Sequence, residues 1–139
     1  MTTDSASSQP TDTVGWTGAA IAAAILTAWG VNTTALLTFG FDGIPAPLWA
    51  PAVLVQTFLH TGLFITAHDA MHGNVSARHP RLNDAVGRLA TRLYALFPYD
   101  RLRDKHLAHH RSPASDADPD FHPGDGPRFW SWYLGFIGE

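Results

Sequence analysis

The run Phe64-Ile65-Thr66-Ala67-His68-Asp69-Ala70-Met71-His72 joins the end of a long apolar segment to a pair of histidines. On an α-helix, residues three and four positions apart project from one face, so His68 and His72 can aim at one point. A second group follows at His106-Leu107-Ala108-His109-His110, again with spacings of three and four. Neutral imidazole is the commonest metal ligand in proteins. The two groups together predict a metal site carried by helices.

The predicted ligands are His68, His72, His106, His109 and His110, with His122 as a further candidate in the loop that follows. A histidine ligand usually anchors its other ring nitrogen on a carboxylate or a carbonyl group. The anchors that we predict are Asp69, Asp104 and Asp118, and Asp116 and Asp120 lie close to the last of these. A single histidine is more often a satisfied polar residue, which is the interpretation favoured for His60 and His79.

Length and composition set the class of protein. A chain of 139 residues fits one domain or part of a larger one. Because the chain contains no cysteine, disulfides, zinc sites built from thiolates and iron-sulfur clusters are excluded from it. Residues 1–13 are rich in Ser and Thr and contain no Lys or Arg, which predicts a disordered tail followed by one domain over 14–139. No cationic segment precedes the apolar region, so we expect no cleaved secretory signal.

Two long uncharged segments predict a hairpin of membrane-spanning helices. There are 29 uncharged residues between Asp12 and Asp42 and 26 more between Asp42 and Asp69. About 20 apolar residues suffice to cross a bilayer. The short sequence Phe41-Asp42-Gly43-Ile44-Pro45 between the segments favours a tight turn. The alternative is a buried pair of helices in a soluble protein.

Positive charge is concentrated directly after this apolar region. Eight of the nine Lys and Arg residues lie between positions 78 and 111, although the net charge of the chain is −3. Since cytoplasmic loops of membrane proteins carry an excess of Lys and Arg, both histidine groups are predicted on the cytoplasmic side. A nucleic-acid patch is disfavoured because the basic segment adjoins the apolar one.

Further helices are predicted beyond the hairpin. An apolar repeat with helical spacing, typical of an interfacial amphipathic helix, runs through Leu82, Val86, Leu89, Leu93 and Leu96. The same pattern also suits a helix packed on a soluble core. A new helix from about Asp100 carries the second histidine group, and an aromatic segment from Phe129 to Ile137 is typical of the start of another span. The expected fold is an all-α membrane protein, with a transmembrane hairpin plus interfacial and cytoplasmic helices that carry the histidines.

The histidines also bear on the choice of metal. The pattern His68-Asp69-x-x-His72 is close to the His-Glu-x-x-His pattern of zinc proteases, but Asp69 is shorter than Glu. A catalytic zinc ion takes three protein ligands and a water, which is fewer ligands than the histidines offered here. A dinuclear iron site at a membrane face is therefore favoured, because imidazole suits iron and iron can change valence.

The sequence around the histidines resembles that of the bacterial β-carotene ketolases, which are membrane di-iron oxygenases of the fatty acid desaturase/hydroxylase superfamily. The resemblance runs from about Pro47 to the end of the chain. It rests on Leu63 to Gly73, Leu96-Phe97-Pro98-Tyr99, His106 to His110, and Pro113 to His122 with its Asp118-Pro119-Asp120-Phe121.

The resemblance implies a carotenoid 4-ketolase that uses iron, O2 and electrons from an external donor such as ferredoxin. Two hydroxylations at one allylic carbon of the β-ionone ring would give a gem-diol, which loses water to form the ketone. The histidines of the two groups would hold the irons, while the protein positions the ring and excludes water. The carotenoid would reach the site from within the membrane.

Two alternatives remain open at this point. A fatty acid desaturase or hydroxylase would share the iron site and differ in substrate. The family also carries a third cluster, His-x-x-His-His, near its C-terminus, and nothing in this sequence matches it. We therefore expect the chain to be the N-terminal part of such an enzyme, and a catalytically incomplete fragment is the second alternative.

Overall fold

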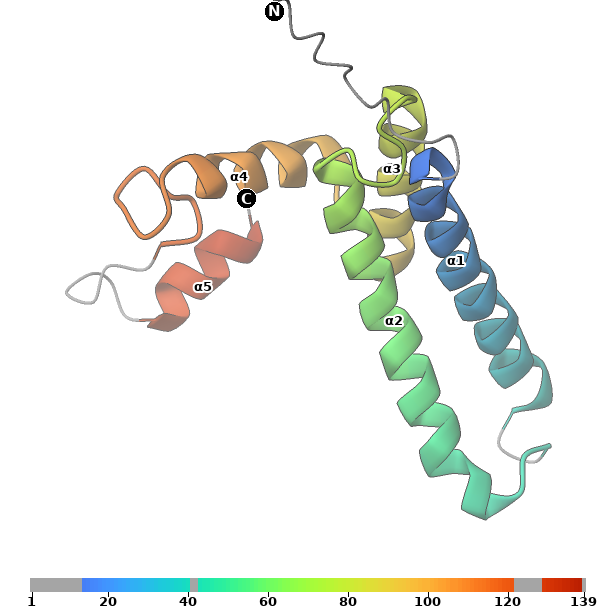
Figure 1. Ribbon diagram of the computed structural model, residues 1–139. Coiled ribbons are helices and arrows are strands. Elements are labelled where there is room, and N and C mark those ends of the chain that lie inside the picture. Colours follow the sequence, from blue (N-terminus) through green and yellow to red (C-terminus); the bar gives the residue numbers. More distant parts are fainter. Residues whose placement is uncertain (1–13, 41–42, 122–128, 139) are drawn as a thin grey trace, which may run out of the picture. The chain divides into compact units, whose positions relative to one another are not determined.

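The computed structural model describes residues 14–40, 43–121 and 129–138, so the predicted tail and His122 lie outside the described residues. The elements in chain order are α1 (Val14–Phe39), the short 3-10 helix η1 (Ala46–Leu48), α2 (Trp49–Met71), α3 (Pro80–Ala95), α4 (Tyr99–Arg111) and α5 (Phe129–Gly138) (Figure 1). No strand occurs in the described ranges, so the predicted all-α class is confirmed. The chain divides into two compact units, Met1–Phe97 and Pro98–Glu139.

In the first unit, α1 and α2 form the predicted hairpin and lie side by side (Figure 1). The segments Trp16–Phe39 and Ala46–Met71 are each long and apolar enough to cross a membrane. Large apolar side chains on both helices are exposed, such as Leu37 at 80% and Phe58 at 77%. Such exposure is costly in water and normal in lipid, which favours the membrane over the soluble alternative.

Polar side chains join the two spans in the half nearer the hairpin turn. The Asn32 amide donates to Gln56 Oε1 at 2.6 Å, and the Gln56 amide donates to Thr33 Oγ1 at 2.8 Å. Closer to the histidine end of α2, Gly62 allows close packing, because a Cβ at this position would lie 3.0 Å from a methyl group of Ile25. These contacts fix the register of α1 against α2, since unpaired polar groups in an apolar layer are costly.

Helix α3 runs antiparallel to α2. Asn83 near its start bonds Ser76, and Tyr94 near its end stacks on His60 with ring centroids 4.8 Å apart. Its face toward α2 consists of small and polar residues, among which Gly87 and Ala90 are buried. The predicted apolar stripe is only partly covered: Leu82, Val86 and Leu93 are half-buried, whereas Leu89 is 47% exposed and Leu96, just beyond the end of the helix, is 84% exposed. The helix is confirmed, but the periodicity did not reveal which side meets its neighbour.

His60 lies three turns below the end of α2, at a depth where an unpaired polar ring would be costly. Trp29 of α1 donates its indole N–H to His60 Nδ1 at 3.2 Å, and the ring of Tyr94 of α3 stacks on the His60 ring. His60 is thus a satisfied polar residue that links three helices, as the sequence interpretation favoured.

The second unit contains α4, the loop over residues 112–121 and α5. Helix α4 begins after Pro98, whose fixed φ suits a helix start. Helix α5 is aromatic, with the rings of Phe129 and Tyr133 stacked 5.7 Å apart and Trp130 69% exposed. Whether α5 opens a further span stays a prediction.

Candidate metal centre

His68 and His72 lie one helical turn apart at the carboxyl end of α2. Their ring centroids are 4.7 Å apart, so both rings project from the same side of the helix, as the spacing predicted. His68 is half-buried and His72 is exposed. The helix ends immediately beyond Met71, where the His72 N–H still donates to the His68 carbonyl at 3.2 Å. The pair therefore lies at the carboxyl end of the apolar helix.

The loop after this pair is tightly fixed. Gly73 adopts a positive φ of 76°, which lets the Asn74 N–H return to the Asp69 carbonyl at 2.8 Å. The Asn83 side chain then clamps Ser76, accepting its N–H at 3.0 Å and donating to its carbonyl at 2.6 Å. Since Asn83 and Ser76 are both buried, these bonds are shielded from water.

The amino end of α1 closes on the same loop. A Cβ at Gly18 would lie 2.2 Å from the Asn74 carbonyl oxygen and 2.8 Å from that of Val75. Only glycine allows this approach, because the obstructing atoms belong to the backbone. Sequence reasoning missed Asn83, and it recognised Gly18 only as one of the small residues that are common where membrane helices pack closely. For Asn83 a signal existed in the small face Asn83, Gly87 and Ala90, which is typical of close helix packing.

Asp69 is a weak anchor for its neighbour. Its carboxylate lies 3.6 Å from His68 Nδ1, beyond hydrogen-bond distance, and both side chains are partly exposed. An ion pair of this exposure contributes little to stability. The anchoring role predicted for Asp69 stays a prediction.

The second histidine group lies in the last turns of α4. His106 Nε2 and His110 Nε2 are 3.1 Å apart, and the rings meet edge to face with centroids 4.5 Å apart. Two nitrogens that bind one metal ion at about 2.1 Å with an angle of about 90° lie about 3.0 Å apart. The separation of the two nitrogens is therefore compatible with a shared metal ion.

His109 turns to the loop and is held by Asp118. Its Nδ1 lies 3.0 Å from both carboxylate oxygens of Asp118 and 3.8 Å from the Asp120 carboxylate. The Asp118 side chain is only 3% exposed and also accepts the backbone N–H groups of Ala114 at 2.8 Å and Asp120 at 2.9 Å. With Nδ1 engaged, Nε2 is the nitrogen left for a metal, which is the usual arrangement of a carboxylate-anchored ligand.

The charge of Asp118 is favoured by this environment. Burial disfavours the charge, but the N–H groups of Asp120 and Ala114 and the ring of His109 outweigh burial and hold the pKa of Asp118 below its ordinary value. Because the pKa of Asp118 is lower in the folded loop than in the unfolded chain, its ionised carboxylate stabilises the fold at pH values above the unfolded-state pKa. This contribution is lost as the pH falls through the lowered value.

The remaining predicted residues are placed as follows. Asp104 is exposed on α4, and its carboxylate makes no hydrogen bond or ion pair within the part of the chain that the structure describes. Its anchoring role stays a prediction. Asp116 is exposed in the loop. His122 falls in the stretch that is not described.

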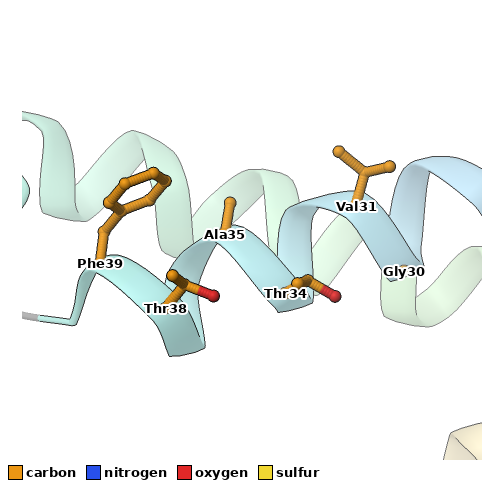
Figure 2. A pocket seen from close by; sticks show the side chains of 6 residues that line it. All are labelled: Gly30, Val31, Thr34, Ala35, Thr38 and Phe39. Atoms are coloured by element: carbon orange, nitrogen blue, oxygen red, sulfur yellow. The ribbon is translucent and has the colours of Figure 1, made fainter.

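A shallow groove on α1 lies away from the first histidine pair, His68 and His72. Figure 2 shows its lining, which consists of Gly30, Val31, Thr34, Ala35, Thr38 and Phe39. These residues occupy the carboxyl half of α1, near the hairpin turn, whereas the loop that follows His72 contacts Gly18 at the amino end. The groove has no titratable group and does not define the site.

Comparison with known proteins identifies the family of this chain. The profile of the family described as "Fatty acid desaturase" matches residues 44–138, which include α2 to α5. The chain belongs to the fatty acid desaturase family. Membership agrees with the predicted superfamily and with the all-α membrane fold. No solved structure matches the chain significantly.

Several curated relatives of this desaturase-family chain are named as ketolases. A β-carotene 4-ketolase of Protosiphon botryoides is 51% identical over 83 residues, which cover 59% of this chain and 21% of the relative. A β-carotene ketolase of Paracoccus sp. (strain PC1) is 45% identical over 118 residues, covering 84% of this chain and 47% of the relative. One of Paracoccus sp. (strain N81106 / MBIC 01143) is 44% identical over 119 residues, covering 85% and 48%. The chain thus spans between a fifth and a half of these relatives, and the predicted ketolase resemblance is confirmed.

Proposed function

We propose that this desaturase-family protein is a β-carotene ketolase-like membrane oxygenase that introduces a keto group at C4 of the β-ionone ring. The observation that carries the proposal is the arrangement on α4. There the Nε2 atoms of His106 and His110 lie 3.1 Å apart, while His109 is anchored through Nδ1 on the buried Asp118. Such an anchor orients a ring for metal binding. The substrate is inferred from the names of the relatives.

A di-iron centre is the metal site that we propose. Its ligands would be His68, His72, His106, His109 and His110, with His122 as a further candidate. Each group offers imidazoles at helical spacing, and the α4 pair has the nitrogen separation that a shared ion requires. The iron would supply activation of O2 in two rounds at one ring carbon, each of which consumes two electrons from an external donor such as ferredoxin and two protons, inserts one oxygen atom into a C–H bond and releases the other as water; the gem-diol would then lose water to give the ketone.

The protein's own residues would orient the ligand histidines and bind the substrate. Asp118 holds the tautomer of His109, which keeps Nε2 as the ligand nitrogen, and the Asn83 clamp fixes the loop that follows His72. The apolar span of α2 ends at His68, so a carotenoid dissolved in the bilayer could present its ring there without passing through water. The basic residues from Arg78 to Arg111 favour a cytoplasmic position for the histidines.

An acyl-chain desaturase or hydroxylase is the second candidate, because the matching family profile carries that name. The iron site would be unchanged, whereas the substrate would be a fatty acyl chain. In a host that makes β-carotene, this candidate predicts altered fatty acids and unaltered carotenoids.

Measurement of the metal content of the purified chain tests the proposed di-iron centre. We expect about two iron ions per chain, with most of this iron lost in His109→Ala. Arg101→Ala is the control, since Arg101 is exposed on the same helix as His109 and belongs to neither histidine group. Zinc in place of iron, or equal iron in the wild type and His109→Ala, would contradict the proposed centre.

Product analysis tests the substrate. Because the chain spans about half of the Paracoccus relatives, it is expressed both alone and in place of the matching part of one of them. Ketones of the canthaxanthin type that disappear in His109→Ala are expected from an active protein in a β-carotene-producing host. Unaltered β-carotene from an intact, iron-loaded protein would contradict the ketolase assignment.

A further inference from the structure

Helix α3 changes character along its length. It carries three exposed arginines, Arg81, Arg88 and Arg92, whereas residues 93–97, at its end and just beyond it, contain no charged side chain. The arginines are separated by seven and four residues, so their guanidinium groups project from one face of the helix. The uncharged end is exposed as well, with Leu96 at 84% and Phe97 at 39%. One helix therefore presents a basic surface that is followed directly by an apolar one.

The contacts of α3 with α2 show where along the hairpin this change occurs. The two helices pack against each other and run antiparallel (Figure 1). The Tyr94 ring lies 4.8 Å from the His60 ring and 5.5 Å from the Phe64 ring, measured between centroids, so Tyr94 lies at a level between these two residues of α2. At a rise of 1.5 Å per residue, Arg92 lies about 3 Å and Arg88 about 9 Å nearer the histidine end of α2 than Tyr94 does.

Helix α2 changes character at the same level. Its last large exposed apolar side chains are Phe64 at 47% and Ile65 at 51%, and the titratable residues of its carboxyl end begin at His68. Arg92 of α3 is therefore level with this last apolar turn, and Arg88 is level with His68. Two helices that are far apart in the chain thus turn from apolar to charged within about one helical turn of each other.

The length of the second span agrees with a membrane boundary at this level. The apolar segment Ala46–Met71 contains 26 residues, whereas about 20 residues suffice to cross the hydrocarbon layer of a bilayer. About six residues are therefore in excess, which allows the end of α2 that carries His68 to lie beyond the layer. A charged arginine inside the layer would be costly, but at its edge the side chain can reach the lipid phosphates.

We propose that the edge of the hydrocarbon layer passes between Arg92 and Leu93, so that α3 inserts its carboxyl end into the bilayer and Arg92 binds the phosphate group of a phospholipid. The Arg92 side chain makes no hydrogen bond or ion pair with the residues that the structure describes. A guanidinium group binds phosphate through paired N–H donors, and anionic lipids attract basic segments at the membrane surface. The inference does not depend on the reaction that the protein catalyses.

The alternative for α3 is a helix that lies flat at the interface, as its apolar repeat indicated in the sequence. The chain contains no cysteine, so a nitroxide label can be attached at one chosen position. Arg81→Cys and Ala95→Cys place the label at exposed positions 14 residues apart, on nearly the same face of α3. In nanodiscs of phosphatidylglycerol and phosphatidylcholine, collisions of each label with a water-soluble nickel chelate and with O2 give its depth.

We expect the label at position 95 to lie about 20 Å deeper than the label at position 81, because 14 residues of a steep helix span about this distance. A flat helix would hold both labels at the same depth. Equal depths, whether both labels are in lipid or both in water, would overturn the inference. Circular dichroism of each labelled chain confirms that the helices are intact.

The phosphate contact is tested with Arg92→Gln. Each chain is purified from nanodiscs that contain the two lipids in equal amounts, and native mass spectrometry gives the ratio of retained phosphatidylglycerol to phosphatidylcholine. We expect this ratio to fall about fivefold in Arg92→Gln, the effect of removing one basic residue at an anionic membrane surface. Arg81→Gln is the control. It removes the same charge about 16 Å further from the boundary and should keep the wild-type ratio.

The remaining outcomes contradict the phosphate contact. Equal ratios in the wild type and Arg92→Gln would show that Arg92 binds no anionic lipid. An equal fall in Arg81→Gln and Arg92→Gln would indicate a general effect of charge without a boundary at Arg92. A lower thermal unfolding midpoint of Arg92→Gln in lipid-free detergent would mean that the guanidinium group binds protein instead of lipid.

Discussion

The pair at the end of α2 is supported by packing from three helices, whereas His109 on α4 is held by one carboxylate nine residues further along the chain. At the first pair, Gly18 of α1 and Asn83 of α3 fix the loop backbone, and the nearest carboxylate, Asp69, stays 3.6 Å from His68 Nδ1. At the second group, Asp118 bonds the imidazole itself. One group is positioned through the backbone and the other through a side chain.

This difference predicts two kinds of damage. Changes around the first pair should alter stability first and metal binding as a consequence, because the supporting residues do not touch the rings. Changes at Asp118 should alter metal affinity directly, because Asp118 sets the tautomer and direction of His109. Measuring stability and iron content together on the same variants therefore tests the comparison.

The largest effect is expected from Gly18→Ala. Its new Cβ would lie 2.2 Å from the Asn74 carbonyl oxygen, so α1 and the loop must move apart. We expect a loss of about 3 kcal/mol in stability, measured by thermal unfolding of the helical circular dichroism signal, together with weaker iron binding.

Gly30→Ala is the control for this change. It lies in the same helix with nothing within 4 Å of the position of its Cβ, and alanine favours helix. Its stability should equal or exceed that of the wild type. If Gly18→Ala were as stable as Gly30→Ala, the close contact between α1 and the loop would be refuted.

The next effect is expected from Asn83→Ala, which leaves the buried N–H and carbonyl of Ser76 without the two bonds that Asn83 supplies. An unsatisfied buried backbone group costs about 2 kcal/mol. Amide hydrogen exchange at Ser76 should become much faster in this variant. Arg81→Gln, an exposed change in the same turn of α3, should leave it slow. Unchanged exchange in Asn83→Ala would mean that the loop is held by other contacts.

The sequence indicated some of these features and could not indicate others. Helical spacing was sufficient to predict that His68 and His72 share a face, because that relation is local. The contact of Gly18 with Asn74 joins residues far apart in the chain, and no local pattern encodes it. Similarly, the leucine stripe of α3 predicted a helix but not its packing side, since in a membrane the large apolar residues can face lipid while small residues face a neighbouring helix.

The anchor of His109 illustrates the same limit within one loop. Asp116, Asp118 and Asp120 alternate along the chain, and composition alone does not distinguish them. The backbone selects Asp118: Ala114 adopts a positive φ of 53°, and the N–H groups of Ala114 and Asp120 both converge on the Asp118 carboxylate. Asp118 was among the predicted anchors, but only the folded loop explains the choice.

A smaller effect on stability and a direct effect on the metal are expected from Asp118→Asn. The amide can still accept a hydrogen bond from His109, but it has lost the charge that favours this tautomer. Iron affinity should fall about tenfold, because anchors of metal-bound histidines typically have effects of this size. Competition with a chelator measures the affinity. Asp120→Asn, 3.8 Å from His109, should have a weaker effect, and equal losses in the two variants would contradict the role of Asp118.

The smallest effect is expected from Asp104→Asn. This variant tests whether Asp104 anchors a histidine, as the sequence predicts, or plays no such part, as its position in the structure indicates. Asp104 was predicted as an anchor from its position beside the second histidine group, yet it is exposed and makes no bond with the described residues. If the structure identifies the anchors correctly, iron affinity and stability should both equal those of the wild type, within about 0.5 kcal/mol. A loss of iron comparable to that of Asp118→Asn would mean that Asp104 approaches a histidine once metal is bound. The second group would then depend on two carboxylates, and its contrast with the backbone-held pair on α2 would be greater still.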